Sequence, residues 1–164
     1  MEIKSKLPSL LTILNALLGL LVIINSIEEE YTTAAVLLII AVLIDFLDGK
    51  VARKLKKSTA FGRELDSLAD IISFGISPAV FAYSIGFIEF TSIFILMLFL
   101  ACGMIRLARF NITDESHFIG MPITMNGLII PIFYFIAPGY ILYIMLISGL
   151  LMISSIRFPK LFRK

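Results

Sequence analysis

The sequence predicts an all-α integral membrane protein, a bundle of six transmembrane helices. Three observations predict this fold. First, 59% of the 164 residues are hydrophobic and the mean hydropathy is +1.01, more apolar surface than a soluble domain of this length can bury. Second, the apolar residues form six runs. Third, the basic residues gather on one side of those runs. No repeat or linker divides the chain, so residues 1–164 are expected to form a single membrane domain.

The first three runs lie before residue 88. Residues 8–27 follow a short basic start, residues 31–47 follow the acidic stretch EEE, and residues 62–87 begin polar and become apolar after Asp70. Each can reach the roughly 20 residues that a spanning helix needs. Helices are expected because lipid offers no partner to free backbone groups.

The other three runs complete the bundle. Residues 90–110 end in RLARFN, residues 123–137 form a short run, and residues 139–156 follow the turn APG. The single cysteine, Cys102, lies inside an apolar run and is expected to be a packing residue, because one cysteine cannot form a disulfide within the chain.

The orientation follows from the basic residues. In a six-span arrangement the N-terminus, the links 48–62 and 106–122, and the C-terminus share one side, and all 14 Lys and Arg fall there. The opposite side carries residues 28–30 (EEE) and Glu89. The positive-inside rule therefore predicts a cell-membrane protein with both termini in the cytoplasm.

The link GKVARKLKKSTAF, residues 49–61, has apolar side chains among its basic ones. This pattern suits a short amphipathic helix on an anionic inner leaflet. A solvated basic loop is the alternative interpretation, and the two are compatible.

Four aspartates stand at the cytoplasmic ends of the second and third runs. Asp45 and Asp48 have i, i+3 spacing, and Asp66 and Asp70 have i, i+4 spacing, so each pair projects from one helix face. If the two helices pack together, four like charges converge and need a compensating cation. Carboxylate oxygens without a nearby His or Cys favour Mg²⁺ or Mn²⁺, and four of them suffice for a two-ion site that binds phosphate. The alternative is that the aspartates pair with neighbouring arginines such as Arg53 and Arg63.

The complete pattern, Asp45-x2-Asp48-Gly49-x2-Ala52-Arg53-x8-Gly62-x3-Asp66-x3-Asp70, resembles the signature of the CDP-alcohol phosphotransferases. The six-run layout agrees with that family as well. The resemblance implies that an acceptor hydroxyl attacks the alcohol-bearing phosphate of a CDP-alcohol and that CMP leaves. It implies Mg²⁺ or Mn²⁺ on Asp45, Asp48 and Asp66, with Asp70 as a further ligand or as the base. It also implies that the CDP-lipid contacts the motif and its link, at Gly49, Ala52, Arg53, Ser58, Thr59 and Gly62.

The start of the first run, PSLLTILN, resembles the family's nucleotide-side segment. Ser9, Thr12 and Asn15 are therefore further candidates for contact with the CDP-lipid. The family usually has Asn after that proline, whereas this chain has Ser9.

The acceptor is indicated by residues 106–127. RLARFN followed by GMPIT resembles the phosphatidylserine synthase branch of the family, which implies L-serine as acceptor and a phosphatidyl or archaetidyl donor. Arg106 and Arg109, spaced i, i+3, suit a carboxylate or a phosphate. They could instead be positive-inside anchors or charges that steer a phosphate. His117 is expected to be a solvated loop residue. Glycerol phosphate, inositol phosphate or an amino alcohol are the alternative acceptors.

An active site at the cytoplasmic rim would be accessible to both substrates, since serine comes from water and the lipid tails stay in the bilayer. A cation transporter is the remote alternative, because acids within spans mark ion pathways, but such sites are expected near the membrane midplane. The resemblance further implies a homodimer, and no nucleic-acid partner is expected.

Overall fold

A computed structural model describes residues 3–54, 59–112 and 118–158, and helices dominate it. In chain order the elements are α1 (Ile3–Ile27), α2 (Tyr31–Lys54), α3 (Ala60–Asp70), the π-helix η1 (Ile71–Ile76), α4 (Ser77–Ser84), α5 (Phe90–Ile112), β1 (Phe118–Ile119), the 3₁₀ helix η2 (Ile123–Met125), α6 (Asn126–Ile136), the 3₁₀ helix η3 (Pro138–Tyr140), α7 (Ile141–Ile153) and β2 (Arg157–Phe158).

The expected membrane helices are present. Among the described residues, four helical stretches are long and apolar enough to cross a membrane: Ser9–Ile27, Tyr31–Lys50, Ala60–Ser84 and Phe90–Ile112. The last two apolar stretches, Ile123–Ile136 and Pro138–Ile153, are shorter. The structure thus confirms a helical membrane bundle, while the number of six spans stays a prediction.

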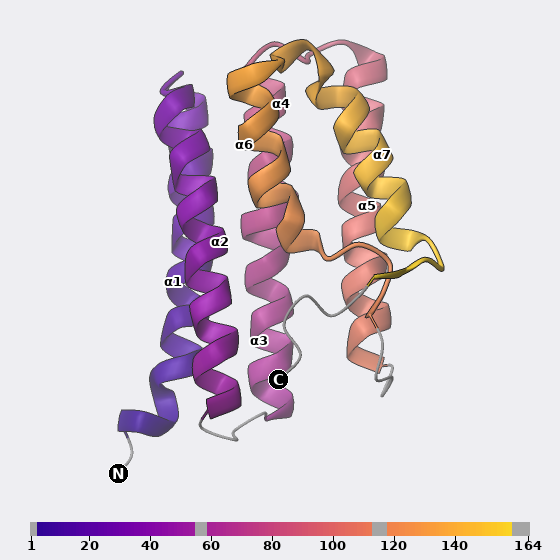
Figure 1. The fold of residues 1–164 in the computed structure, drawn as a ribbon. Coiled ribbons are helices and arrows are strands. Elements are labelled where there is room, and N and C mark those ends of the chain that lie inside the picture. Colours follow the sequence, from indigo (N-terminus) through magenta and orange to yellow (C-terminus); the bar gives the residue numbers. More distant parts are fainter. Residues whose placement is uncertain (1–2, 55–58, 113–117, 159–164) are drawn as a thin grey trace.

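The helices stand side by side, and the chain reverses direction at alternating ends of the bundle (Figure 1). The α1–α2, α4–α5 and α6–α7 connections lie at one end, and the end of α2, the start of α3 and the end of α5 lie at the other. Within this arrangement α1 packs along α2, α5 packs along α7, and the continuous α3–η1–α4 rod lies against α1. The link between α2 and α3 therefore brings both aspartate pairs to one end of the bundle.

The core consists of apolar side chains contributed by most of the helices. Leu38, Phe74, Phe81, Ile130 and Met145 are fully buried in it. The ring of Phe81 meets the ring of Tyr134 edge to face, with centroids 5.2 Å apart, a geometry that aromatic pairs prefer. Large apolar side chains also cover the outside of the helices, as expected where lipid is the solvent.

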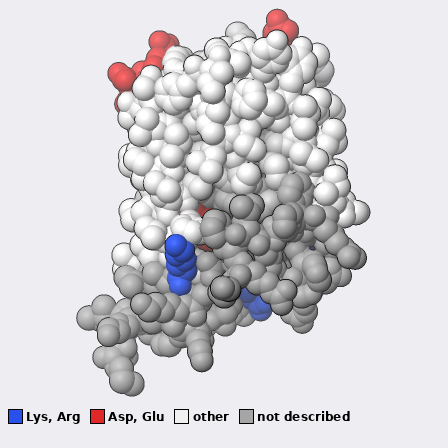
Figure 2. All heavy atoms as spheres, in the orientation of Figure 1, with Lys and Arg blue, Asp and Glu red and all other residues white. Residues whose placement is uncertain are grey.

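Charges separate along the bundle. Figure 2 shows acidic atoms at the upper end of the visible face and basic atoms in its lower part, with a few acidic atoms just above them. Between the two ends lies a band of residues other than Lys, Arg, Asp and Glu. This separation agrees with the distribution of charged residues along the sequence, and it leaves the band between the ends free to contact lipid.

The expected separate interfacial helix within residues 49–61 is wrong for the described part of that link. Gly49–Lys54 continue α2 without a break, and Ala60 and Phe61 already belong to α3. Only residues 55–58, which lie outside the described residues, separate Lys54 from the Thr59 cap of α3. The basic residues after Asp48 extend a membrane helix because nothing in Gly49–Lys54 ends it; no proline occurs there.

The link between α5 and α6 is held against the end of α7. Strand β1 pairs antiparallel with β2, the Gly120 N–H donates to Ile156 O at 2.9 Å, and the Met121 N–H donates to Leu151 O at 3.1 Å. Gly120 has a φ of +80°, and a Cβ there would collide with the carbonyl of Met152. This pairing places η2 where it packs against α2, η1 and α5.

Candidate active site

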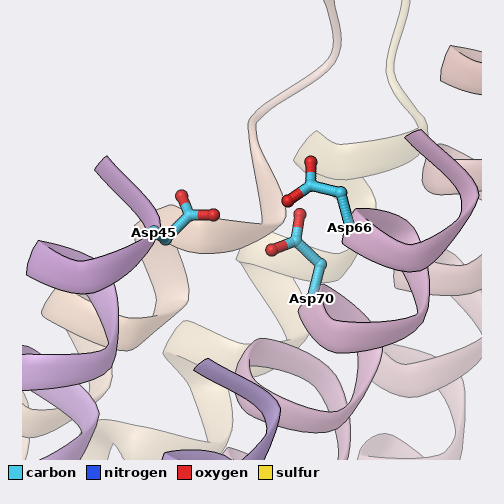
Figure 3. A group of neighbouring side chains, drawn as sticks. All are labelled: Asp45, Asp66 and Asp70. Carbon is cyan, nitrogen blue, oxygen red and sulfur yellow. The ribbon is translucent and has the colours of Figure 1, made fainter. Parts of the chain in front are cut away.

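Three of the four aspartates converge between α2 and α3 (Figure 3). Asp45 projects from α2 toward Asp66 and Asp70, which lie one turn apart on α3. Each residue offers one carboxylate oxygen, and these oxygens lie within 4.8 Å of one another. The i, i+4 spacing predicted from the sequence is what lets Asp66 and Asp70 face Asp45 together.

This cluster fits a hard divalent cation. All three candidate ligands are carboxylates, the oxygen donors that Mg²⁺ and Mn²⁺ prefer. Asp70 is only 7% exposed, and its Oδ1 has no hydrogen-bond partner among the described residues. Three acids at such short range need positive charge, and a buried carboxylate oxygen without a donor is suited to receive it.

Asp48 is placed differently from the other three aspartates. Its Oδ2 accepts a hydrogen bond of 2.5 Å from the Thr12 hydroxyl on α1, and its Oδ1 is buried without a partner in the described part of the chain. Asp48 still interacts electrostatically with Asp45, Asp66 and Asp70. The structure therefore brings three predicted ligands together and holds the fourth beside them by a contact to α1.

Arg106 is a cation next to this cluster. It is 7% exposed and interacts electrostatically with Asp70, Asp45 and Asp66, although no ion pair joins it to a carboxylate of the described residues. Its guanidinium carbon lies 5.5 Å from the centre of the Phe110 ring. A buried guanidinium near three acids, without a carboxylate ion-paired to it in the described part of the chain, is suited to bind an anion that enters the site.

Arg109 faces a different element. Its Nη1 donates a hydrogen bond of 3.1 Å to Ile153 O, at the end of α7. The predicted arginine pair is thus divided, since Arg106 faces the carboxylates while Arg109 connects α5 to α7.

The predicted CDP-lipid residues are distributed around the α2–α3 end. Gly49 is half-buried on α2, and Thr59 caps α3 by accepting a hydrogen bond of 3.0 Å from the Gly62 N–H. Ser58 and the side chains of Ala52 and Arg53 lie outside the described residues.

On α1, Ser9 is half-buried whereas Asn15 is 1% exposed, and Asn15 Oδ1 has no hydrogen-bond partner in the described ranges. The Ser73 hydroxyl donates a hydrogen bond of 2.8 Å to the Asn15 carbonyl, which places Asn15 beside η1, just after Asp70. Gly19 continues this close contact, because a Cβ on it would lie 2.8 Å from Ser73 Cα. The α1 candidates are therefore distributed from the rim toward the interior of the bundle.

Sequence reasoning missed one hydrogen-bonded group near the carboxylates. The Ser67 hydroxyl donates to Asn111 Oδ1 at 3.1 Å, and Asn111 Nδ2 donates to Glu64 Oε2 at 3.2 Å. The signal available in the sequence was Asn111 itself, a polar residue directly after RLARF and on the same side as the acids.

It also missed Asn126 at the start of α6, which is fully buried. Its Nδ2 donates to Ile123 O at 3.0 Å, so it closes the turn from η2 into α6. The only sequence signal was a polar residue at the beginning of an apolar run.

A membrane helical bundle with a carboxylate cluster and a buried arginine at one end defines a class of protein suited to bind phosphorylated substrates at the lipid–water boundary. The comparison with known families is more specific. The model described as CDP-alcohol phosphatidyltransferase matches residues 5–158, so this chain belongs to that family, and the resemblance read from the aspartate motif is confirmed.

Several curated proteins are similar to this chain over most of its length. The chain is 42% identical over 163 residues to an archaetidylserine synthase of Methanothermobacter thermautotrophicus, covering 94% of this chain and 70% of the relative. It is 37% identical over 158 residues to a CDP-diacylglycerol–serine O-phosphatidyltransferase of Bacillus subtilis, covering 93% of this chain and 89% of the relative. A protein of the same name from Methanocaldococcus jannaschii is 38% identical over 152 residues, which cover 91% and 71%.

Proposed function

We propose that this protein transfers the phosphatidyl or archaetidyl group of a CDP-activated lipid to the hydroxyl of L-serine and releases CMP. The family match supports the CDP-lipid donor, and the names of the relatives support serine as the acceptor. The observation that carries the proposal is the cluster of Asp45, Asp66 and Asp70 with Arg106 buried beside it.

The carboxylates would hold Mg²⁺ or Mn²⁺. Asp45, Asp66 and Asp70 supply three oxygens, and Asp48, within electrostatic reach of all three, would complete a two-ion site. Divalent cations bound there would neutralise the carboxylates and offset the charge of the pyrophosphate.

Asp70 and Arg106 would act on the acceptor serine during the transfer. The serine hydroxyl oxygen forms a new bond to the lipid-bearing phosphorus, the bond from that phosphorus to the bridging oxygen breaks, and CMP leaves with that oxygen. Asp70 takes the hydroxyl proton during the attack, which makes the hydroxyl a competent nucleophile. Arg106 orients serine by binding its carboxylate with two parallel N–H donors.

The CDP-lipid would contact the α2–α3 end and the start of α1. Small residues at Gly49, Ala52 and Gly62 allow a bulky nucleotide to approach the backbone. The further contacts would come from Arg53, Ser58, Thr59, Ser9, Thr12 and Asn15. Since Thr12 already donates to Asp48, its contribution would pass through that carboxylate.

The membrane placement follows from the charge distribution. Residues 1–164 form one domain of six spans in the cell membrane, with both termini and the active site in the cytoplasm. The short last two helical stretches would cross as a packed pair, and a homodimer is the expected assembly.

The test is a defined acceptor panel. Purified protein receives CDP-diacylglycerol or CDP-archaeol, Mg²⁺ or Mn²⁺, and in turn serine, glycerol 3-phosphate, inositol phosphate or ethanolamine. The expected result is CMP release that depends on serine and on the metal, with a serine phospholipid as product. Equal CMP release with another acceptor and none with serine would contradict the proposal.

A further inference from the structure

We propose that Asn111 is a positioning residue, which ties the end of α5 to α3 and thereby fixes Arg106 beside the carboxylates. The inference rests on the proposed function, in which Arg106 binds the acceptor's carboxylate. Asn111 itself would touch neither substrate.

Two hydrogen bonds form this bridge between α5 and α3, and Asn111 is the acceptor in one and the donor in the other. Asn111 accepts from Ser67 Oγ at 3.1 Å through Oδ1 and donates to Glu64 Oε2 at 3.2 Å through Nδ2. Both partners are on α3, and their i, i+3 spacing places them on one face of that helix. Because one bond needs an acceptor and the other a donor, an amide at position 111 meets both requirements with a single side chain.

The bridge lies next to the candidate active site. Ser67 directly follows Asp66 on α3, and Arg106 precedes Asn111 by five residues on α5. The bridge therefore joins a neighbour of a cluster carboxylate to the helix that carries the buried arginine. A shift of α5 along α3 would move Arg106 relative to Asp66 and Asp70.

The bridge acts at one end of a longer contact between α5 and the α3–η1–α4 rod. Helix α5 packs against α7, η1 and α4, whereas it meets α3 itself at few positions. The Phe110 ring, 5.5 Å from the Arg106 guanidinium carbon, belongs to α5 as well. Phe110 can therefore orient Arg106 on its own helix, whereas the bridge adds the polar contact that holds the end of α5 against α3.

The test compares four variants with the parent enzyme. Asn111→Ala removes both bonds, and Asn111→Asp replaces the donor to Glu64 with a second carboxylate. The double variant Glu64→Gln with Asn111→Asp restores a donor and acceptor pair in reversed order. Ile112→Ala is the matched control, because Ile112 is the next residue of α5 and is 85% exposed.

The first readout is steady-state kinetics. Loss of the bridge should raise the KM for serine about three- to tenfold and leave the KM for the CDP-lipid near the parent value. The double variant should recover most of the parent's serine KM, and Ile112→Ala should match the parent. A purely structural role would instead lower the melting temperature or raise both KM values together.

The second readout does not depend on activity. Phenylglyoxal modification of Arg106, followed by mass spectrometry with the exposed Arg63 as internal reference, should be severalfold faster in Asn111→Asp and return toward the parent rate in the double variant. Unchanged labelling of Arg106, or a double variant that behaves like Asn111→Asp, would overturn the inference. A parent enzyme without serine-dependent CMP release would overturn the proposed function instead, while the labelling result would still decide the role of Asn111.

Discussion

Thr12 on α1 donates a hydrogen bond of 2.5 Å to Asp48 on α2, 36 residues further along the chain. The bond occupies one oxygen of an aspartate whose three counterparts converge on one another. It also fixes α1 against α2 at the end of the bundle that carries the candidate active site. Asp48 thus depends on α1 for its orientation, which distinguishes it from Asp45, Asp66 and Asp70.

Thr12→Val should lower turnover about tenfold, since valine keeps the shape but leaves a buried carboxylate oxygen without its donor. Thr12→Ser keeps the hydroxyl and should retain most of the activity. CMP release at saturating serine measures both variants. Equal activity in Thr12→Val and the parent would show that Asp48 needs no support from α1.

Asp45→Asn and Asp66→Asn should each weaken Mn²⁺ binding and reduce turnover by orders of magnitude, because each removes one of three converging charged oxygens. Mn²⁺ binding is measured by electron paramagnetic resonance, independently of turnover. Glu89→Gln, an exposed acid outside the cluster, is the control and should bind Mn²⁺ like the parent. Full activity of the parent after chelator treatment would contradict the metal assignment.

Asp70→Asn should lower kcat by a factor of about 100 or more, the scale of a lost general base, while CDP-lipid binding stays near normal. We expect kcat to fall without a loss of CDP-lipid binding, because the amide cannot accept the serine proton yet preserves the shape of the side chain. Equilibrium binding of the CDP-lipid and single-turnover CMP release measure the two effects separately. A parallel loss of binding and turnover would assign Asp70 to substrate binding instead.

The two arginines should behave differently, although their i, i+3 spacing makes them look equivalent in the sequence. Arg106→Lys should raise the KM for serine, since an ammonium cannot offer a carboxylate two parallel donors. Arg109→Lys should leave that KM nearly unchanged, because Arg109 donates to the end of α7. Serine titrations at saturating CDP-lipid decide between these outcomes. Equal increases of the serine KM in both variants would indicate that both arginines bind the acceptor.

Gly19→Ala should destabilise the protein by about 1–3 kcal/mol, because the added methyl group would press on the Ser73 backbone of η1. Gly139→Ala is the matched control, as a Cβ there meets no atom within 4 Å. Thermal unfolding in detergent compares the two variants. Similar melting temperatures would mean that α1 and η1 can separate at little cost.

The sequence predicted the membrane helices well because long apolar runs leave the chain few alternatives in lipid. The prediction for residues 31–47 ended too early, since hydropathy falls after Leu47 while the helix continues to Lys54. The π-helix at Ile71–Ile76 was not predictable either. Its residues are as apolar as those of an ordinary helix, and the sequence does not show which contacts η1 makes with other helices, such as the Ser73–Asn15 hydrogen bond to α1.

For the site, helical spacing predicted that Asp66 and Asp70 share a face, and the α2–α3 connection predicted that Asp45 meets them. Spacing could not show that Asp48 turns toward Thr12, because that contact depends on how α1 packs. The same limit explains why Arg106 and Arg109 were treated alike, and why Asn111 was missed: its partners Ser67 and Glu64 come from a helix more than 40 residues away.

The π-helix η1 directly follows Asp70 and has a consequence for how this chain can tolerate insertions and deletions. An α-helix turns by about 100° per residue, so deleting one residue from Ile71–Ile76 to regularise the helix would rotate Asp66 and Asp70 by about that angle against Phe81. Either the carboxylates would leave Asp45 or the aromatic ring would leave the core. Many deletions in surface loops have no such effect. Here the number of residues between Asp70 and Phe81 determines whether the carboxylates and the buried ring can both keep their positions.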